Sequence, residues 1–128
     1  MNKIIQVKIF NGLLDNFFDF LETISIDLQS DIILTRTTIS FIRKSNPRLV
    51  VQQFMEYSCN YRREIQNCNE SFFLNYQHTD NFNVNTEYVN GNLILKLKTI
   101  WQTLDKRQKA TVFYYLNKLL NAGDKCLI

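Results

Sequence analysis

The chain has very little glycine, proline and histidine, and this scarcity limits the chemistry it can carry. Its 128 residues include 3 glycines, 1 proline and 1 histidine. The glycines lie far apart, so the chain has no glycine-rich phosphate-binding loop and no nucleophile elbow. His78 lies in a polar segment, which leaves little for a three-ligand zinc site or a Ser-His-Asp triad. We therefore predict no enzymatic activity, no catalytic residues, and no cofactor, metal or small-molecule substrate site.

Long apolar runs and a disulfide framework are also lacking. No run approaches the roughly 18 to 20 apolar residues that span a membrane. The N-terminal segment is interrupted by Lys8 and Asp15 and has no small-residue cleavage site, so we do not expect a secretory signal. The three cysteines, Cys59, Cys68 and Cys126, are odd in number and match no metal-ligand spacing. We expect an intracellular protein, or one packaged from an intracellular pool, whose reduced thiols act as buried or half-buried apolar side chains.

Apolar residues and asparagine are what the chain has in abundance. Apolar residues make up 45% of the sequence and aromatic residues 13%. With this length, the composition predicts one domain, residues 1–128, with a buried core. There are 15 Asn, 13 Ile and 10 Phe, but only 2 Ala. The abundant residues have A/T-rich codons and the scarce ones G/C-rich codons, which indicates an AT-rich genome.

Apolar residues recur at three- and four-residue steps along most of the chain, and this period predicts helices. The helical segments are 10–28, 31–44, a helix that starts at Pro47, 92–104, and a last helix that starts at Asp105 and closes at Gly123. We therefore predict an all-α fold, a compact bundle of about five helices, with the first, third and last at its centre. The Asn-rich segment 75–90 lacks a helical period and is predicted to be one long loop.

The sequence also predicts caps and core positions in these helices. Ser30 or Asp31 is predicted to cap the second helix and Asn46 the third, while Asp105 and Gln108 form a capping box for the last. The inward side chains of the second helix are predicted to be Leu34, Thr38, Phe41 and Ile42. Aromatic core residues are predicted at Phe54, Trp101 and Phe113.

Charge is distributed unevenly along the chain. Residues 1–31 hold two lysines against five acids, a net of −3, and residues 91–128 hold seven basic against two acidic groups, a net of +5. The acidic set of the first helix is Asp15, Asp19 and Glu22. We interpret this set as a solvated face rather than a divalent-cation site. The acidic first helix and the basic last pair could attract each other within the fold, or stack head to tail between copies.

Five basic residues gather around the turn between the last two predicted helices. They are Lys96, Lys98, Lys106, Arg107 and Lys109. Such a cluster can contact phosphates, although soluble helices normally carry lysine on the solvent side and no known nucleic-acid motif is present. We take this cluster as the candidate contact for a protein partner or for a nucleic acid.

The stretch between the third predicted helix and the loop is interpreted as a structural joint or interface. Its residues are Pro47, Arg62, Arg63, Glu70, Phe72, Phe73 and Leu74. Glu70 is predicted to pair with Arg62 or Arg63, or to cap a local turn. The three consecutive apolar side chains cannot share one face of a helix or strand. Either the chain folds back and buries them, or one side is offered to a protein partner.

Three stretches carry a resemblance: FNGLLDNFFDFLETI, NPRLVVQQFMEY and YRREIQNCNESFFLNY. They resemble a set of small, uncharacterised proteins of nucleocytoplasmic large DNA viruses, the giant viruses of algae and amoebae. The matching positions are Phe10, Asn11, Asn46, Pro47, Tyr61, Ile65, Glu70, Phe72, Phe73 and Leu74. The chain departs from the pattern at Asn69, where an aspartate is expected. The match spans residues 10–76.

The resemblance implies an all-helical fold, a viral source that agrees with the codon bias, and synthesis in the host cytoplasm. It supplies no activity and no catalytic residues. We expect a non-enzymatic viral structural or protein-interaction protein, self-associating or built into a larger assembly, located in the viral factory or in the virion. The alternative is a nucleic-acid-associated protein that acts through the basic turn. Mimicry of a host factor by a helical bundle is a third hypothesis.

Overall fold

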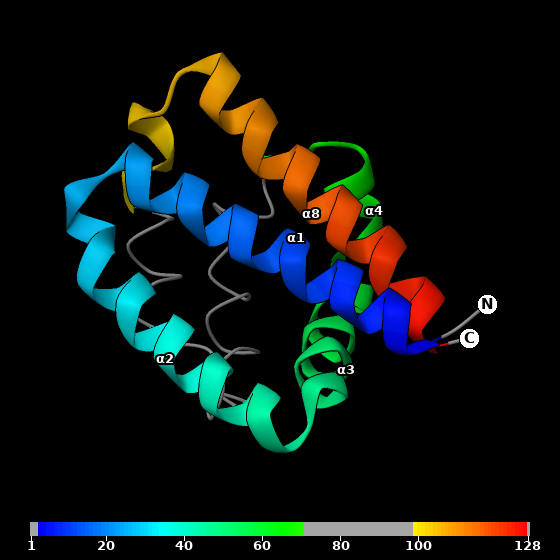
Figure 1. Ribbon diagram of the computed structural model, residues 1–128. Helices are drawn as coiled ribbons and strands as arrows, with labels where there is room; N and C mark the ends of the chain where they lie inside the picture. Colours follow the sequence, from blue (N-terminus) through cyan, green and yellow to red (C-terminus); the bar gives the residue numbers. More distant parts are fainter. Residues whose placement is uncertain (1–2, 71–98, 128) are drawn as a thin grey trace.

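The computed structural model describes residues 3–70 and 99–127, and within these ranges every element is helical (Figure 1). The long helices are α1 (Lys3–Ile24), α2 (Gln29–Ser45), α3 (Pro47–Ser58) and α8 (Lys106–Leu127). The short elements are η1 (Ile26–Leu28), η2 (Cys59–Tyr61), α4 (Arg62–Gln66) and η3 (Trp101–Thr103). The all-α prediction is confirmed for these ranges, with four packed long helices. The predicted loop 75–90, and the predicted helix 92–104 before residue 99, lie outside them.

The main contact of the fold is between α1 and α8, two 22-residue helices that lie side by side and antiparallel (Figure 1). The buried apolar residues of α1 recur at three- and four-residue steps, with Phe18 added next to Phe17, and are Val7, Phe10, Leu14, Phe17, Phe18 and Leu21. Their counterparts on α8 are Val112, Phe113, Leu116, Leu119 and Leu120. The ring of Phe17 stacks on Tyr115 with 5.5 Å between centroids. The apolar residues whose spacing predicted the first and last helices are therefore the ones that pack these two helices against each other.

Helix α8 begins where predicted but continues past the predicted end. The backbone N–H of Gln108 donates to Asp105 Oδ1 at 2.7 Å, and the N–H of Asp105 donates to Gln108 Oε1 at 3.0 Å. This confirms the capping box. The prediction that Gly123 closes the helix is wrong, because α8 runs to Leu127 and Gly123 is buried inside it. Met55 of α3 occupies the space of a side chain there, its Cγ 2.9 Å from where a Cβ would lie, so this glycine allows α3 and α8 to approach closely.

The side of α2 that faces the core differs from the prediction. The buried or half-buried stripe is Leu28, Ile32, Thr35, Ile39 and Ile42. Leu34 is 59% exposed and Phe41 is 76% exposed, so the prediction that both point inward is wrong. The physical reason is that α2 is apolar on two sides. Its inner stripe contains a threonine, and its outer side carries three large apolar residues. The spacing of apolar residues in the sequence therefore predicted the wrong side of α2 to face the core.

The side-chain cap near the start of α2 belongs to the preceding turn η1 and is Ser25, upstream of the predicted Ser30 and Asp31. The Oγ of Ser25 accepts a hydrogen bond from the N–H of Asp27 at 3.2 Å, and this opens η1. Helix α2 then continues from Leu28 without a side-chain cap. The predicted caps, Ser30 and Asp31, instead lie within the first turn of α2. The turn η1 lies between α1 and α2, and Ser25 caps η1 alone.

Helix α3 begins at Pro47, as predicted, since proline fits the first helical turn. Asn46 precedes it, but its side chain makes no capping hydrogen bond. Its N–H donates to Ile42 O at 2.8 Å and so ends α2. On α3, Phe54 is half-buried and meets Phe10 of α1 edge-on, with ring centroids 5.3 Å apart. Phe54 therefore lies at the border of the core.

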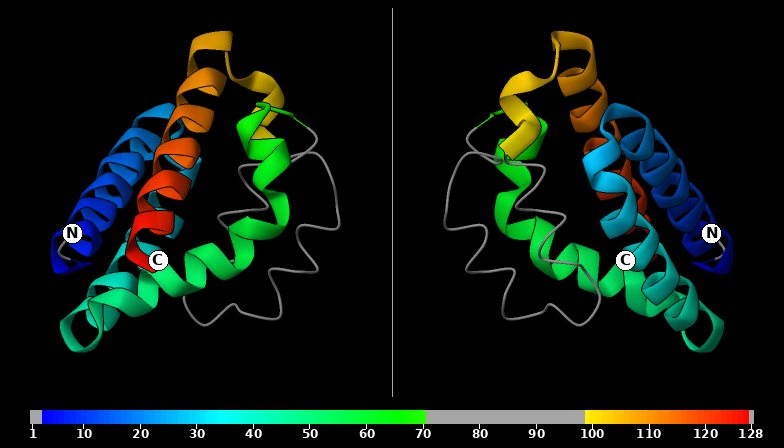
Figure 2. Two further views of the ribbon diagram at one scale, coloured as in Figure 1. Left: turned by 90° about the vertical axis from the view of Figure 1, so that its right-hand side faces the viewer. Right: turned by 90° about the vertical axis from the view of Figure 1, so that its left-hand side faces the viewer.

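The other two predicted core aromatics are confirmed, because Trp101 is 0% and Phe113 3% exposed. Their rings meet edge-on with centroids 5.6 Å apart. Figure 2 shows the chain turning sharply between α2 and α3, and α4 continuing toward η3. This path brings α4 alongside α8, so the segment after α3 returns to the central helix pair.

Substituting the two phenylalanines Phe10 and Phe41 separately tests the orientation of α2. We expect Phe10→Ala to lower the free energy of unfolding by about 3 to 5 kcal/mol, because it empties a fully buried site. We expect Phe41→Ala to change it by no more than about 0.5 kcal/mol, because that ring is mostly in water. Urea unfolding at low protein concentration measures both. A loss at Phe41 as large as that at Phe10 would show that the outer side of α2 is buried.

Candidate functional site

The acidic residues of α1 are paired with arginines of α2. Arg36 Nη1 lies 2.8 Å from Asp19 Oδ1 and 3.3 Å from Glu22 Oε2. Arg43 Nη1 lies 2.9 Å from Asp15 Oδ1. The side chain of Asp19 is still 64% exposed, so the face is solvated as predicted, but its charge is largely neutralised within the fold. Residues 3–70 and 99–127 contain no group of three or more His, Cys, Asp or Glu side chains placed to hold a metal ion.

The same two arginines make further contacts with α1. Arg43 Nε donates to Asn11 Oδ1 at 3.0 Å, and its Nη2 donates to Asn11 O at 3.2 Å. The guanidinium of Arg36 lies 5.7 Å from the ring centroid of Phe18, within the range of a cation–π contact. These contacts, together with the ion pairs, fix which side of α2 faces α1.

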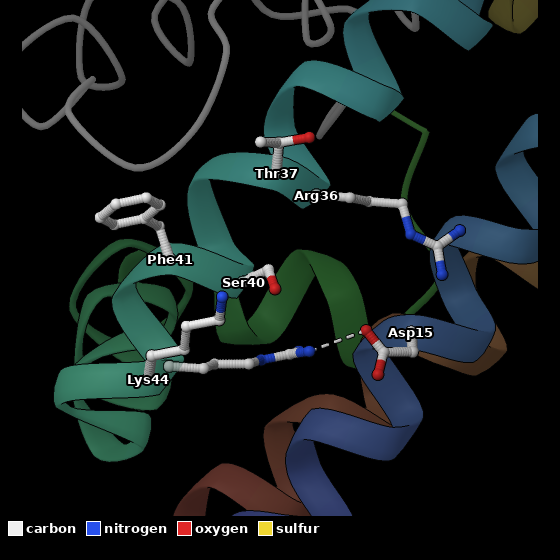
Figure 3. Close-up of a pocket in the computed structure, with 7 residues that line it drawn as sticks. Asp15, Arg36, Thr37, Ser40, Phe41 and Lys44 are labelled. Atoms are coloured by element: carbon white, nitrogen blue, oxygen red, sulfur yellow. Dashed lines mark hydrogen bonds and ion pairs between the residues drawn. The ribbon is translucent and has the colours of Figure 1, made fainter.

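An open pocket of about 510 Å³ lies beside these pairs, between α1 and α2 (Figure 3). It is lined by Asp15, Arg36, Thr37, Ser40, Phe41, Arg43 and Lys44. Both guanidinium groups are already committed to α1, and Thr37 Oγ1 donates to Ile33 O at 2.8 Å. The lining contains three cations against one carboxylate and has no histidine or cysteine. It can attract an anionic group, but it offers no nucleophile with an adjacent base.

The predicted joint ties α4 to α8, with partners other than those predicted. Arg62 Nη1 and Nη2 donate to the two carboxylate oxygens of Asp124 at 2.9 and 2.7 Å, a bidentate pair that raises the pKa of Arg62. The amide of Asn117 donates to Ile65 O at 3.0 Å and to Phe113 O at 2.9 Å. Sequence reasoning missed Asp124 and Asn117, because neither belongs to a motif. The one available signal was that Asn117 follows Phe113 by four residues, beside the apolar stripe.

Glu70 makes the contact at the other end of the joint. Its Oε1 accepts from Trp101 Nε1 at 3.1 Å and lies 2.9 Å from Lys109 Nζ. The prediction that Glu70 pairs with Arg62 or Arg63 is wrong, because Arg62 and Glu70 reach opposite ends of α8. Hydrogen bonds from Lys109 and then from Trp101 lower the pKa of the Glu70 carboxyl. The remaining joint residues, Phe72, Phe73 and Leu74, lie outside the described ranges.

The predicted basic cluster divides into parts with different roles. Lys106 and Arg107 are exposed in the first turn of α8. Lys109 is half-buried, pairs with Glu70, and places its Nζ 5.7 Å from the ring centroid of Trp101. Lys96 and Lys98 lie outside the described ranges. Lys109 therefore belongs to the joint, and Lys106 and Arg107 form the accessible part of the cluster.

The cysteines also differ from one another. Cys126 is buried, as predicted, and its burial raises the pKa of its thiol, an effect partly opposed by Arg48. Cys59 and Cys68 are exposed, so the prediction of buried or half-buried thiols is wrong for these two. All three are free. Cys68 adopts a positive φ of 53° in the turn after α4, where the chain leaves its helical path.

Large apolar side chains are exposed together on the outer side of α2. Ile33 is 57% exposed, Leu34 59% and Phe41 76%, with exposed Thr37 between them. Figure 3 shows Phe41 projecting from α2 away from Asp15 of α1. We call Ile33, Leu34, Thr37 and Phe41 the α2 outer strip. Clustered exposure of large apolar groups is typical of a contact surface.

Comparison of the chain with models of protein families, with curated proteins and with solved structures finds no match. In the described part of the chain, every helix is too short or too polar to cross a membrane. The surfaces that bear on function are therefore the α2 outer strip and the first turn of α8.

The Glu70 contact predicts a pH dependence of stability. The pKa of Glu70 is lowered in the folded protein from its ordinary value of 4.5. A carboxyl of this kind stabilises the fold above its unfolded-state pKa, and the contribution is lost as the pH falls through the lower, folded-state pKa. We expect wild type to lose more stability than Glu70→Gln on acidification below pH 4.5, in urea unfolding over a pH series. The exposed Glu56→Gln control should follow wild type. Parallel profiles for wild type and Glu70→Gln would contradict the contact.

Proposed function

We propose that this chain is a non-enzymatic viral structural or protein-interaction protein that self-associates or is built into a larger assembly. The α2 outer strip carries this proposal, because its three large apolar side chains are each more than half exposed. A folded chain normally gains free energy by burying such groups, at about 25 cal/mol for each Å² removed from water. A protein partner that covers the strip would recover this free energy.

The viral source and location rest on the sequence. The resemblance of residues 10–76 to giant-virus proteins and the abundance of amino acids that have A/T-rich codons support a viral origin. A location in the host cytoplasm, in the viral factory, or in the virion follows from that origin. The interaction role does not depend on the source, because the α2 outer strip is a property of the chain itself.

The kind of contact proposed is apolar rather than electrostatic. A head-to-tail stack would need the acidic face of α1 to attract the basic turn of another copy. Asp15, Asp19 and Glu22 are already paired with Arg36 and Arg43 of the same chain. Because these carboxylates are already paired within the chain, they attract the basic turn of a second copy only weakly. Salt screens such exposed charges further.

Quantitative mass spectrometry of purified virus particles tests the assembly role. We expect the protein in high copy number, and retained after a high-salt wash, because an apolar contact is not weakened by salt as ion pairs are. The double variant Ile33→Ser/Phe41→Ser should be lost from particles, and the matched variant Tyr114→Ser, exposed on α8, should be retained. Absence of the wild-type protein from particles, with no protein bound in infected cells, would end this proposal.

A nucleic-acid-associated role is the second candidate, favoured by the exposure of Lys106 and Arg107. Cations in the first turn of a helix lie at its positive end, so their position opposes the helix dipole. A bound phosphate would relieve that repulsion and would also accept from the free N–H groups of the first turn. The Asp105 carboxylate already accepts from one of these N–H groups and carries the same sign of charge as a phosphate. We therefore rank the protein-interaction role first.

Salt dependence separates the two candidates. If the turn binds duplex DNA, the logarithm of affinity should fall with the logarithm of salt concentration, with a slope near −0.9 for each phosphate contacted. Lys106→Gln/Arg107→Gln should then flatten the slope by about two such contacts. Lys109 is left unchanged because it pairs with Glu70. The control is the double variant Lys118→Gln/Lys125→Gln. We expect only feeble binding of wild type at about 150 mM salt. Tight, salt-sensitive binding that the first variant alone removes would reverse the ranking.

A further inference from the structure

We propose that the start of α1 is a docking surface for an anionic lipid membrane. Five exposed residues in the first two turns of this helix form it, and we call them the α1 basic-aliphatic patch: Lys3, Ile4, Ile5, Lys8 and Ile9. The side chains of Ile4, Ile5 and Ile9 are 68%, 51% and 47% exposed. The α2 outer strip has no part in this contact, so the inference goes beyond the proposed function.

The outer side of α1 is open beside the patch. Gly12 follows Lys8 by four residues and Ile9 by three, so it lies on the same side of the helix. A Cβ added at Gly12 would meet no atom of the described residues within 4 Å. The opposite side of the same turns is the one that packs into the core, through Val7 and Phe10. A broad, flat surface can therefore approach the patch without moving another helix.

The charge of the patch is positive and is not neutralised by the chain. Residues 3–14 contain two lysines and no acid. The first acidic residue of α1 is Asp15, which is paired with Arg43. Among residues 3–70 and 99–127, no carboxylate forms an ion pair with Lys3 or Lys8. Both ammonium groups are therefore available to an anionic surface outside the molecule.

The neighbouring helices add positive charge at the same end of the molecule. Because α1 and α8 are antiparallel, the end of α8, with exposed Lys125, lies beside the start of α1 (Figure 1). Arg48, at the start of α3, reaches this end too, where its Nη2 donates to Cys126 O at 3.5 Å. Asp124, the acid in the last turns of α8, is held by Arg62. The patch is thus part of a basic end of the fold.

The alternation of isoleucine and lysine matches a lipid surface better than a protein. Lysine is depleted at protein interfaces, and the strongest contacts there come from Trp, Tyr and Arg, none of which is in the patch. At a membrane surface, aliphatic side chains enter the boundary between headgroups and acyl chains. Lysine stems lie along the apolar surface while their ammonium groups stay at the headgroup phosphates. One bilayer surface therefore accommodates both residue types.

A nucleic acid accounts for only half of the patch. Its phosphates attract the lysines, but a phosphate backbone leaves the three exposed isoleucines in water. Anionic lipid supplies the phosphates together with an apolar layer beneath them. The patch covers the first two turns of α1 only, so the contact is small and reversible.

Co-sedimentation with lipid vesicles is the first test. The full chain should bind phosphatidylcholine vesicles that contain about 30% phosphatidylserine at least about tenfold more tightly than vesicles of phosphatidylcholine alone, because anionic headgroups attract the lysines. Raising the salt from about 0.1 to 0.5 M should remove most of this difference. Equal binding to the two kinds of vesicle, or no binding to either, would overturn the proposal.

A pair of charge variants tests the lysines. Lys3→Gln/Lys8→Gln should weaken binding to the phosphatidylserine vesicles by at least about tenfold, since each lysine at such a surface contributes about fivefold. The control Lys106→Gln/Lys118→Gln removes the same charge from exposed positions elsewhere on α8. It should weaken binding by no more than about twofold. Equal losses in the two variants would show that net charge alone, and not the patch, attracts the vesicles.

A pair of apolar variants tests the isoleucines. Ile5→Gln/Ile9→Gln should weaken vesicle binding by at least about tenfold, because it removes the aliphatic groups that enter the bilayer. Glutamine keeps a high helix propensity, and circular dichroism melting establishes that the variant is folded. The matched control Ile33→Gln/Leu34→Gln changes two exposed apolar residues of α2 and should bind like wild type. Unchanged binding of Ile5→Gln/Ile9→Gln would contradict insertion.

An environment-sensitive dye tests which side of the molecule meets the lipid. In a chain with Cys59→Ser and Cys68→Ser, which lacks the exposed thiols, the dye is attached at Gly12→Cys, where a side chain has open space. Its emission should shift to the blue when phosphatidylserine vesicles are added. The same dye at Ala110→Cys, exposed on α8, should not shift. Equal shifts at the two positions would rule out docking through α1.

The remaining outcomes separate this inference from the two functions considered above. If wild type ignores the vesicles and Lys3→Gln/Lys8→Gln loses affinity for duplex DNA, the patch binds nucleic acid and the lipid proposal is overturned. Failure of the α2 outer strip to bind a protein would end the proposed function without changing vesicle binding, because Ile33→Gln/Leu34→Gln leaves the α1 basic-aliphatic patch intact.

Discussion

The antiparallel contact between α1 and α8 is the interaction on which the other helices depend. Each helix has 22 residues and buries an apolar stripe against the other. Phe17 and Phe20 of α1 both lie against Tyr115 of α8, with ring centroids 5.5 and 6.0 Å apart. Helices from the two ends of the described chain thus form the centre, so the segments between them must return to the pair. Helices α2, α3 and α4 are each positioned by their own contacts with α1 or α8.

Polar contacts decide which side each outer helix presents to this centre. The α1–α2 ion pairs and the Arg62–Asp124 pair are partly exposed, and such pairs contribute only about 0 to 1 kcal/mol each. Apolar burial supplies far more free energy, but it does not distinguish two apolar sides of one helix. The small electrostatic terms can therefore settle the rotation of α2, because Arg36 and Arg43 find carboxylates only when they face α1.

The sequence predicted the fold where one signal was strong and unopposed. The stripes of α1 and α8, the capping box at Asp105 and the start at Pro47 depend on neighbouring residues, and all are present. The errors at Leu34, Gly123 and Glu70 share a cause, since each depends on a helix distant in the sequence. Leu34 is turned outward by pairs to α1, Gly123 is fixed by Met55 of α3, and Glu70 by α8. The candidate surface on α2 emerged only when its inner side was known.

Helix α2 keeps large apolar residues on its outer side although its inner stripe contains a polar residue. Its inner stripe includes Thr35, which is 2% exposed, whereas its outer strip holds Phe41 at 76% exposure. A helix selected only for folding would place its largest apolar residues inside, because each buried one contributes about 1.5 to 3 kcal/mol. Keeping Ile33, Leu34 and Phe41 outside forgoes that stabilisation and adds a risk of non-specific association. Under the proposed interaction role a protein partner would bury these outer residues, and the stabilisation missing from the monomer would be recovered in that contact.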